Sequence, residues 1–154
     1  MHPRIEGRDF FKFPPDGVMQ IRGVVKEKEL RYPTMLDKNG EECLIVVKDG
    51  KTTGLTFGRG TGIESFVRIY SDYGIFSTSM EVAIYPHSHR GGPFSDTGDS
   101  GPIVVDSYGR IVGLLTGGGG LTDSTDVSYL SPYYWVEERI KEVFPDSSLY
   151  PIAA

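Results

Sequence analysis

Residues 97–106 read TGDSGPIVVD, so one serine stands between two glycines and ahead of an apolar run. Gly98 and Gly101 can adopt backbone angles that a Cβ atom would forbid, and the turn can therefore raise the Ser100 hydroxyl above the backbone. Such a turn also directs consecutive N–H groups to one point. Donors prearranged there stabilise the charge on an attacked carbonyl by about 3–4 kcal/mol each. The stretch predicts a displayed nucleophile, with the N–H groups of Gly98 and Ser100 as an oxyanion hole.

Taken alone, GDSG is also compatible with a solvated turn between two strands, because all four residues are turn formers. Two flanking stretches favour the first interpretation. Residues 47–58 read VKDGKTTGLTFG, which predicts a hairpin, and residues 109–118 read GRIVGLLTGG, which predicts a strand that ends in glycines.

The order and spacing of these three stretches resemble the second barrel of chymotrypsin-like (trypsin-fold) serine peptidases. The resemblance covers roughly residues 43–145. Within the family, the sequence is particularly similar to uncharacterised serine-peptidase-like proteins of fungi. One departure is Pro102, which follows Gly101 directly where the commonest family form has a second glycine.

The resemblance implies an all-β fold, a six-stranded Greek-key barrel with a C-terminal helix. We expect an N-terminal extension or inter-barrel linker over residues 1–35, the barrel and helix over 36–146, and a tail over 147–154. Twenty glycines and ten prolines fit many short strands joined by tight turns. Residues 133–144 carry apolar and aromatic side chains at helical spacing, which predicts an amphipathic helix with one face packed on the barrel.

The same resemblance assigns roles around the serine. Ser100 would be acylated by a peptide carbonyl, and Asp99 and Gly101 would support its turn. In the family this aspartate pairs with a newly released N-terminus or makes local hydrogen bonds, and we favour the local bonds. The edge that binds the substrate backbone as an extra strand would comprise Thr116, Gly117 and Gly118. A flexible strand end is the alternative for this edge.

The general base and the acid that orients it are not identifiable. In the family both come from the first barrel, which the three stretches do not include. The histidines are His2, His87 and His89, and none matches a family motif. Without a base a serine hydroxyl is a poor nucleophile. We therefore expect an incomplete serine endopeptidase whose base comes from a missing barrel or a partner chain. The alternative is an inactive module that binds peptides or a protein.

Composition limits the other function classes. The net charge is −5, which gives no basic footprint for nucleic acid. No apolar run has the ~20 residues of a membrane span, and the start lacks the apolar core of a secretory signal. Cys43 is the only cysteine and cannot form an internal disulfide, so the chain leans intracellular. No cofactor is expected, and the alternation of His87 with His89 is better explained by a loop than by a metal site.

A half of a two-barrel fold should leave an apolar surface bare. We expect that surface near the aromatic segment that contains Phe10, Phe11 and Phe13.

Overall fold

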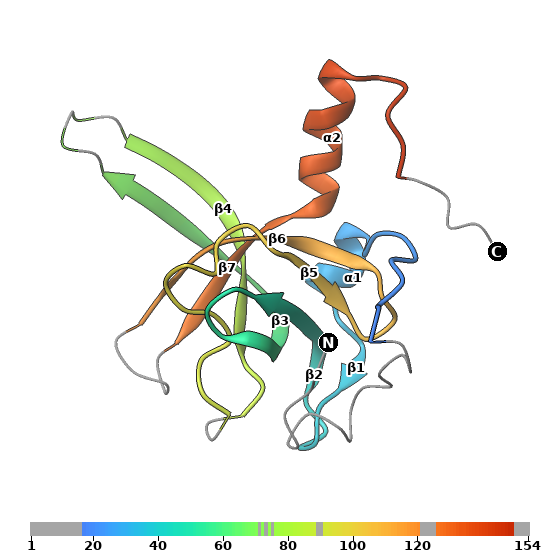
Figure 1. Cartoon of the computed structure of the whole chain (residues 1–154), viewed down its shortest axis with the longest axis vertical. Coiled ribbons are helices and arrows are strands. Elements are labelled where there is room, and N and C mark those ends of the chain that lie inside the picture. The colour runs from blue at the N-terminus through green and yellow to red at the C-terminus, as the bar shows by residue number, and fades with distance from the viewer. Residues whose placement is uncertain are drawn as a thin grey trace.

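A computed structural model describes residues 17–70, 72, 74, 76–88, 91–120 and 126–149. Antiparallel strands dominate it, with one short helix before them and one longer helix after them (Figure 1). The elements in chain order are α1 (Glu27–Arg31), β1 (Met35–Leu36), β2 (Glu42–Gly50), β3 (Gly54–Tyr70), β4 (Phe76–Pro86), β5 (Ile103–Asp106), β6 (Ile111–Gly119), β7 (Val127–Pro132) and α2 (Tyr133–Val143).

The strands close into a ring. Their order is β1-β2-β3-β4-β7-β6-β5, and β2 also pairs with β5 through Val46↔Asp106 and Val47↔Val105. Six strands therefore form the closed ring, and β1 is added to β2 at the side. Because β5 returns to lie beside β2 after the β2-β3-β4 meander, the connection is a Greek key. This confirms the predicted fold class. The ring is uneven, since the β3–β4 hairpin extends well beyond it (Figure 1).

The barrel interior holds the main core, and β2 explains how it forms. Leu44 and Val46 point into the main cluster, as alternation along a strand requires. Val47 points outward, yet it is buried in a second cluster that includes Met19 and Ile21. Both faces of β2 are therefore covered, which is why its sequence is continuously apolar instead of alternating.

Residues 17–35, predicted as extension or linker, lie along the barrel. Ile111 donates its N–H to Gly23 O at 2.8 Å, and Val25 donates to Ile111 O at 2.9 Å. The side chains of Val25 and Leu30 belong to the main core. The described part of this segment thus packs on the barrel and contributes to its core. The predicted domain boundary at residue 36 stays a prediction.

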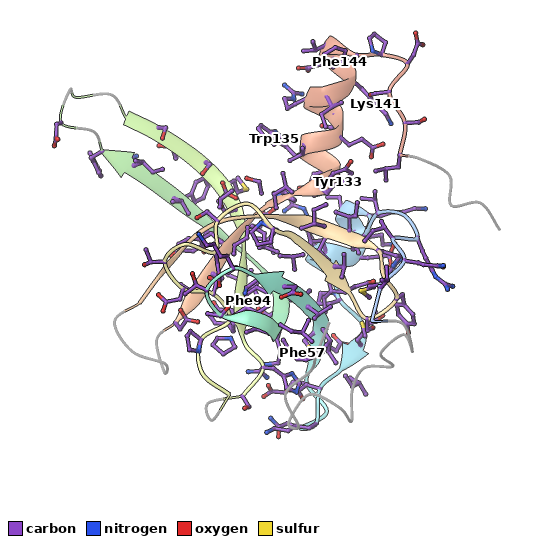
Figure 2. The ribbon with its side chains drawn as sticks, in the orientation of Figure 1. Phe57, Phe94, Tyr133, Trp135, Lys141 and Phe144 are labelled. Carbon is purple, nitrogen blue, oxygen red and sulfur yellow. The ribbon has the colours of Figure 1, made fainter. Side chains whose placement is uncertain are left out.

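Helix α2 is present as predicted, but its expected burial is wrong. Trp135, Val143 and Phe144 are 50%, 70% and 64% exposed, and no residue of α2 is buried. The reason is geometric: α2 follows β7 without a loop and stands away from the ring, with Phe144 at its far end (Figures 1 and 2). Tyr134 packs on the main core at the start of the helix, but the described part of the chain leaves Trp135, Ile140, Val143 and Phe144 exposed.

We predict that Gly58→Ala destabilises the barrel. A Cβ atom at Gly58 would lie 2.5 Å from Ile84 Cγ2 and 2.8 Å from Phe94 Cδ2, both in the closely packed core. Such overpacking costs about 1–3 kcal/mol of unfolding free energy, measurable by urea denaturation. Gly117→Ala is the matched control on β6, where a Cβ atom meets nothing within 4 Å. Equal losses in the two variants would contradict the prediction.

Candidate active site

Ser100 is exposed on the turn that precedes β5. Gly98 has φ +96° and Gly101 has φ +103°, the backbone region that the flanking glycines permit. Gly101 donates its N–H to Leu115 O at 2.9 Å, and Leu115 donates to Pro102 O at 3.1 Å. These bonds hold the turn against β6, so that Ser100 lies beside the stretch that begins at Thr116.

The Asp99 side chain points away from solvent and fixes the turn to the β2–β3 hairpin. Its Oδ1 accepts the N–H of Thr52 at 2.6 Å and that of Thr53 at 3.3 Å. Its Oδ2 accepts the Thr53 hydroxyl at 2.5 Å and the N–H of Asp96 at 3.3 Å. Only the bond from Asp96 is local in the sequence, because Thr52 and Thr53 lie 47 and 46 residues earlier, and the local role expected for Asp99 stays a prediction.

Asp99 has one further partner, which the sequence did not reveal. Lys48 Nζ, from β2, lies 3.0 Å from Asp99 Oδ2, and both side chains are 0% exposed. The ammonium also donates to the Thr53 hydroxyl at 2.6 Å and to Gly54 O at 3.3 Å, and it lies 5.6 Å from the centre of the Phe94 ring. The position of Lys48 directly after the apolar residues of β2 is the sequence signal that indicates a buried lysine in need of an acidic partner.

Electrostatics act differently on the two partners: burial lowers the pKa of the Lys48 ammonium, and the bond to Asp99 offsets this only in part. Burial alone would raise the pKa of Asp99, but the hydrogen bonds from Thr53, Thr52 and Lys48 outweigh burial and hold that pKa well below its ordinary value. Gly50 makes room for the carboxylate, because a Cβ atom there would lie 2.5 Å from Asp99 Oδ1. The nucleophile turn therefore rests on a buried, hydrogen-bonded ion pair.

The N–H groups predicted to form the oxyanion hole have no acceptor within the described residues. The N–H of Asp99 is donated to Asp96 O at 3.0 Å and that of Gly101 to Leu115 O. Those of Gly98 and Ser100, by contrast, form no hydrogen bond in the part of the chain that the structure describes. They are thus left to bind a group from outside.

The predicted substrate edge has one paired side and one open side. Gly117 pairs with Tyr129 and Gly118 with Ser128 on β7, with a bulge between Leu115 and Gly117. On the other side β5 pairs only as far as Leu114, opposite Ile103. Past that point no described strand pairs with this side of β6, which leaves room for an added strand.

The segment before Ser100 is tied to the start of β7 by contacts that the sequence did not predict. Ser95 Oγ lies 2.6 Å from Ser128 Oγ, and the N–H of Phe94 is donated to Asp126 Oδ2 at 3.2 Å. Phe94 is fully buried inside the barrel (Figure 2), and its C=O accepts the Thr56 hydroxyl at 2.6 Å. Residues 94–100 are therefore anchored at both ends, and the space between them and Gly118 is shaped by fixed side chains.

His87 lies elsewhere in the barrel. It donates its N–H to Phe57 O at 3.2 Å. Burial lowers the pKa of His87, and the charges of Arg59 and Lys38 lower it further. These groups belong to β3 and to the turn before β2, not to the turn of Ser100. His2 and His89 lie outside the described residues, as do Phe10, Phe11 and Phe13.

Within the described part of the chain, no three His, Cys, Asp or Glu side chains are grouped so as to hold a metal ion. A separate search of these residues finds no helix that is long and apolar enough to span a membrane.

Solved structures with this fold are serine proteases. The chain is similar to chymotrypsin of Cellulomonas bogoriensis, with 16% identity and a TM-score of 0.50 over 82% of this chain and 54% of that one. It is also similar to protease A of Thermobifida fusca, with 16% identity and a TM-score of 0.48 over 85% and 55%. The likeness to the chymotrypsin shows the trypsin-like fold. The chain spans about half the length of each of these two proteins. Neither a scan against family models nor a search of curated proteins gives a match.

We predict that Lys48→Met strongly destabilises the fold. The substitution keeps the apolar stem but leaves the Asp99 carboxylate buried without its cation, which costs about 3–5 kcal/mol of unfolding free energy. Lys51→Met, in the exposed turn of the same hairpin, is the control and should change stability by less than about 0.5 kcal/mol. A loss at Lys48 no larger than the loss at Lys51, measured by urea denaturation, would show that the pair does not support the turn.

Acid should weaken the fold through Asp99. Its folded pKa lies below the ordinary value of 3.8, so the unfolded chain takes up a proton first as pH falls. The stability that this group contributes is complete above about pH 5 and is progressively lost as pH falls towards the folded pKa. In Asp99→Asn the unfolding free energy should be lower at neutral pH but should decline less between about pH 5 and pH 3 than in the wild type. Parallel declines in urea titrations would refute this assignment.

Proposed function

We propose that the chain is the nucleophile-bearing half of a serine endopeptidase, with Ser100 forming the acyl-enzyme. The observation that carries the proposal is the exposed Ser100 on a turn held by buried Asp99, with two N–H groups that have no acceptor within the described residues. The fold is that of serine proteases, but a likeness at 16% identity supports the fold alone. The activity is argued from the site.

The reaction needs few groups. Ser100 Oγ attacks the peptide carbonyl and gives its proton to a base, which passes it to the leaving amine. The N–H groups of Gly98 and Ser100 bind the oxygen that becomes negative. Water then attacks the acyl group and releases Ser100. The substrate backbone lies along Thr116, Gly117 and Gly118 as an added strand, which holds the scissile bond next to Ser100.

The base is the part that we assign to another barrel or chain. The charges that shift the pKa of His87, the one described histidine, belong to Arg59, Lys38 and Asp37 and not to the Ser100 turn, and the solved chymotrypsin with this fold is about twice as long. The exposed stripe of α2 fits the same conclusion, because a bare apolar surface of this kind marks a contact with a partner.

A second candidate is a module that binds peptides without cleaving them. The open edge of β6 favours it, since strand addition needs only backbone groups and no base.

A peptide boronic acid distinguishes the two functions. At alkaline pH it forms a tetrahedral adduct with a serine oxygen without help from a base, so we expect a tetrahedral signal from bound boron by ¹¹B NMR in the wild type. Ser100→Ala should lose the signal and Ser107→Ala, in the β5–β6 turn, should keep it. Equal affinity of the peptide for wild type and Ser100→Ala, without an adduct, would identify a binding module. No binding at all to folded protein would overturn both.

A further inference from the structure

We propose that Glu81 is the positioning acid for the base that activates Ser100, so that this barrel supplies two of the three catalytic groups. The inference rests on the proposed function and extends it. It also differs from the expectation by resemblance, in which acid and base both come from the first barrel.

Glu81 is unusual among the buried acids of the barrel. Asp99 pairs with Lys48, Asp106 with Arg110, and Asp37 with Arg59, at 3.0, 2.8 and 2.6 Å. The Glu81 side chain belongs to the same buried set, with the residue 5% exposed, but no cation among the described residues pairs with it. A buried carboxylate without a cation is costly. A group that is missing from the described residues would complete this site.

Its present partners are hydroxyl groups. Ser131 Oγ lies 2.9 Å from Glu81 Oε2 and 3.2 Å from Oε1, and Thr116 Oγ1 lies 3.3 Å from Oε2. On the other side of β4, Glu81 pairs with Ser65 of β3, which is also a small residue. Each hydroxyl has one proton, whereas an ionised carboxylate offers about four acceptor sites. Thr116 can also give its proton to Tyr129 O at 3.1 Å. Glu81 therefore retains acceptor capacity for a further N–H donor.

The position of Glu81 relates it to Ser100. Thr116, which contacts the carboxylate, directly follows Leu115, whose C=O accepts the N–H of Gly101. The Ser100 turn is thus bonded to Leu115, and the next residue of β6, Thr116, contacts Glu81. The sheet order β4-β7-β6-β5 thus gives a row that runs from Glu81 on β4 past Ser131 on β7 and Thr116 on β6 to the turn of Ser100, which precedes β5.

An imidazole at this row could perform both tasks of a base. One ring nitrogen takes the proton of Ser100 Oγ while the other N–H donates to the Glu81 carboxylate, which fixes the tautomer. Once protonated, the ring is also the cation that Glu81 lacks. The proton from Ser100 stays on the imidazole and is not passed on to Glu81. The missing barrel or partner then has to supply a histidine but no acid.

Free imidazole can stand in for that histidine. Ser100 attacks a fluorophosphonate probe, so that an O–P bond forms, the P–F bond breaks, fluoride leaves and imidazole takes the proton. We expect imidazole to accelerate labelling of the wild type at least about tenfold more than that of Glu81→Gln, since loss of an orienting acid costs up to about 10⁴-fold in a complete triad. Glu64→Gln, whose carboxylate pairs with Arg31 instead, is the matched control and should respond as the wild type.

The second probe is 1-methylimidazole, which accepts a proton at its free nitrogen but has no N–H for Glu81. It should accelerate wild type and Glu81→Gln equally, and the wild type less than imidazole does after correction for basicity. This comparison needs no variant, so it holds even where Glu81→Gln fails to fold. Equal acceleration by the two bases in the wild type, or an imidazole response that Glu81→Gln retains, would overturn the proposal.

The boronate adduct separates this result from the proposed function. It requires Ser100 but neither Glu81 nor a base, so wild type and folded Glu81→Gln should both form it. An adduct together with labelling that ignores Glu81 would refute the positioning role alone. Absence of the adduct in every variant would refute the function of Ser100 itself.

Discussion

The buried ion pair between Lys48 and Asp99 connects the two parts of the chain on which the site depends. Lys48 belongs to β2, the strand that closes the ring with β5, and Asp99 precedes Ser100 by one residue. Two buried charges lose their hydration, and the attraction between them offsets that loss only where further hydrogen bonds complete the geometry. Thr52 and Thr53 supply those bonds. The Ser100 turn is consequently held to the barrel by buried contacts.

Local chemistry predicted most of the fold. Turn formers around Ser100 and in the 47–58 hairpin, and apolar runs such as the one in β2, depend on neighbours within a few residues, and the structure confirms the ring that they imply. The partner of Asp99 could not be found in this way, because Lys48 lies 51 residues earlier and its burial depends on ring closure.

Glu81 and α2 show the same limit of sequence-based prediction, because the burial of each differs from what its sequence pattern indicates. Alternation places Glu81 on the outer face of β4, where a charged residue is expected in water, yet it is buried against Ser131 and Thr116. The aromatic stripe of α2 has the pattern of a packed helix, yet it is exposed. The sequence pattern of a helix or strand shows which of its faces is apolar, but not whether another part of the chain covers that face.

Both exceptions lie on one side of the barrel, because α2 begins two residues after Ser131. In the proposed enzyme, this is the side on which a second barrel or a partner would place the histidine. Glu81 lies on β4, and the Ser100 turn is bonded to Leu115 of β6, so the ladders between β4, β7 and β6 fix how far apart the two residues lie. In the proposed enzyme, the histidine would then bond two groups whose positions are already fixed, and orientation set in advance of the reaction lowers the barrier that remains.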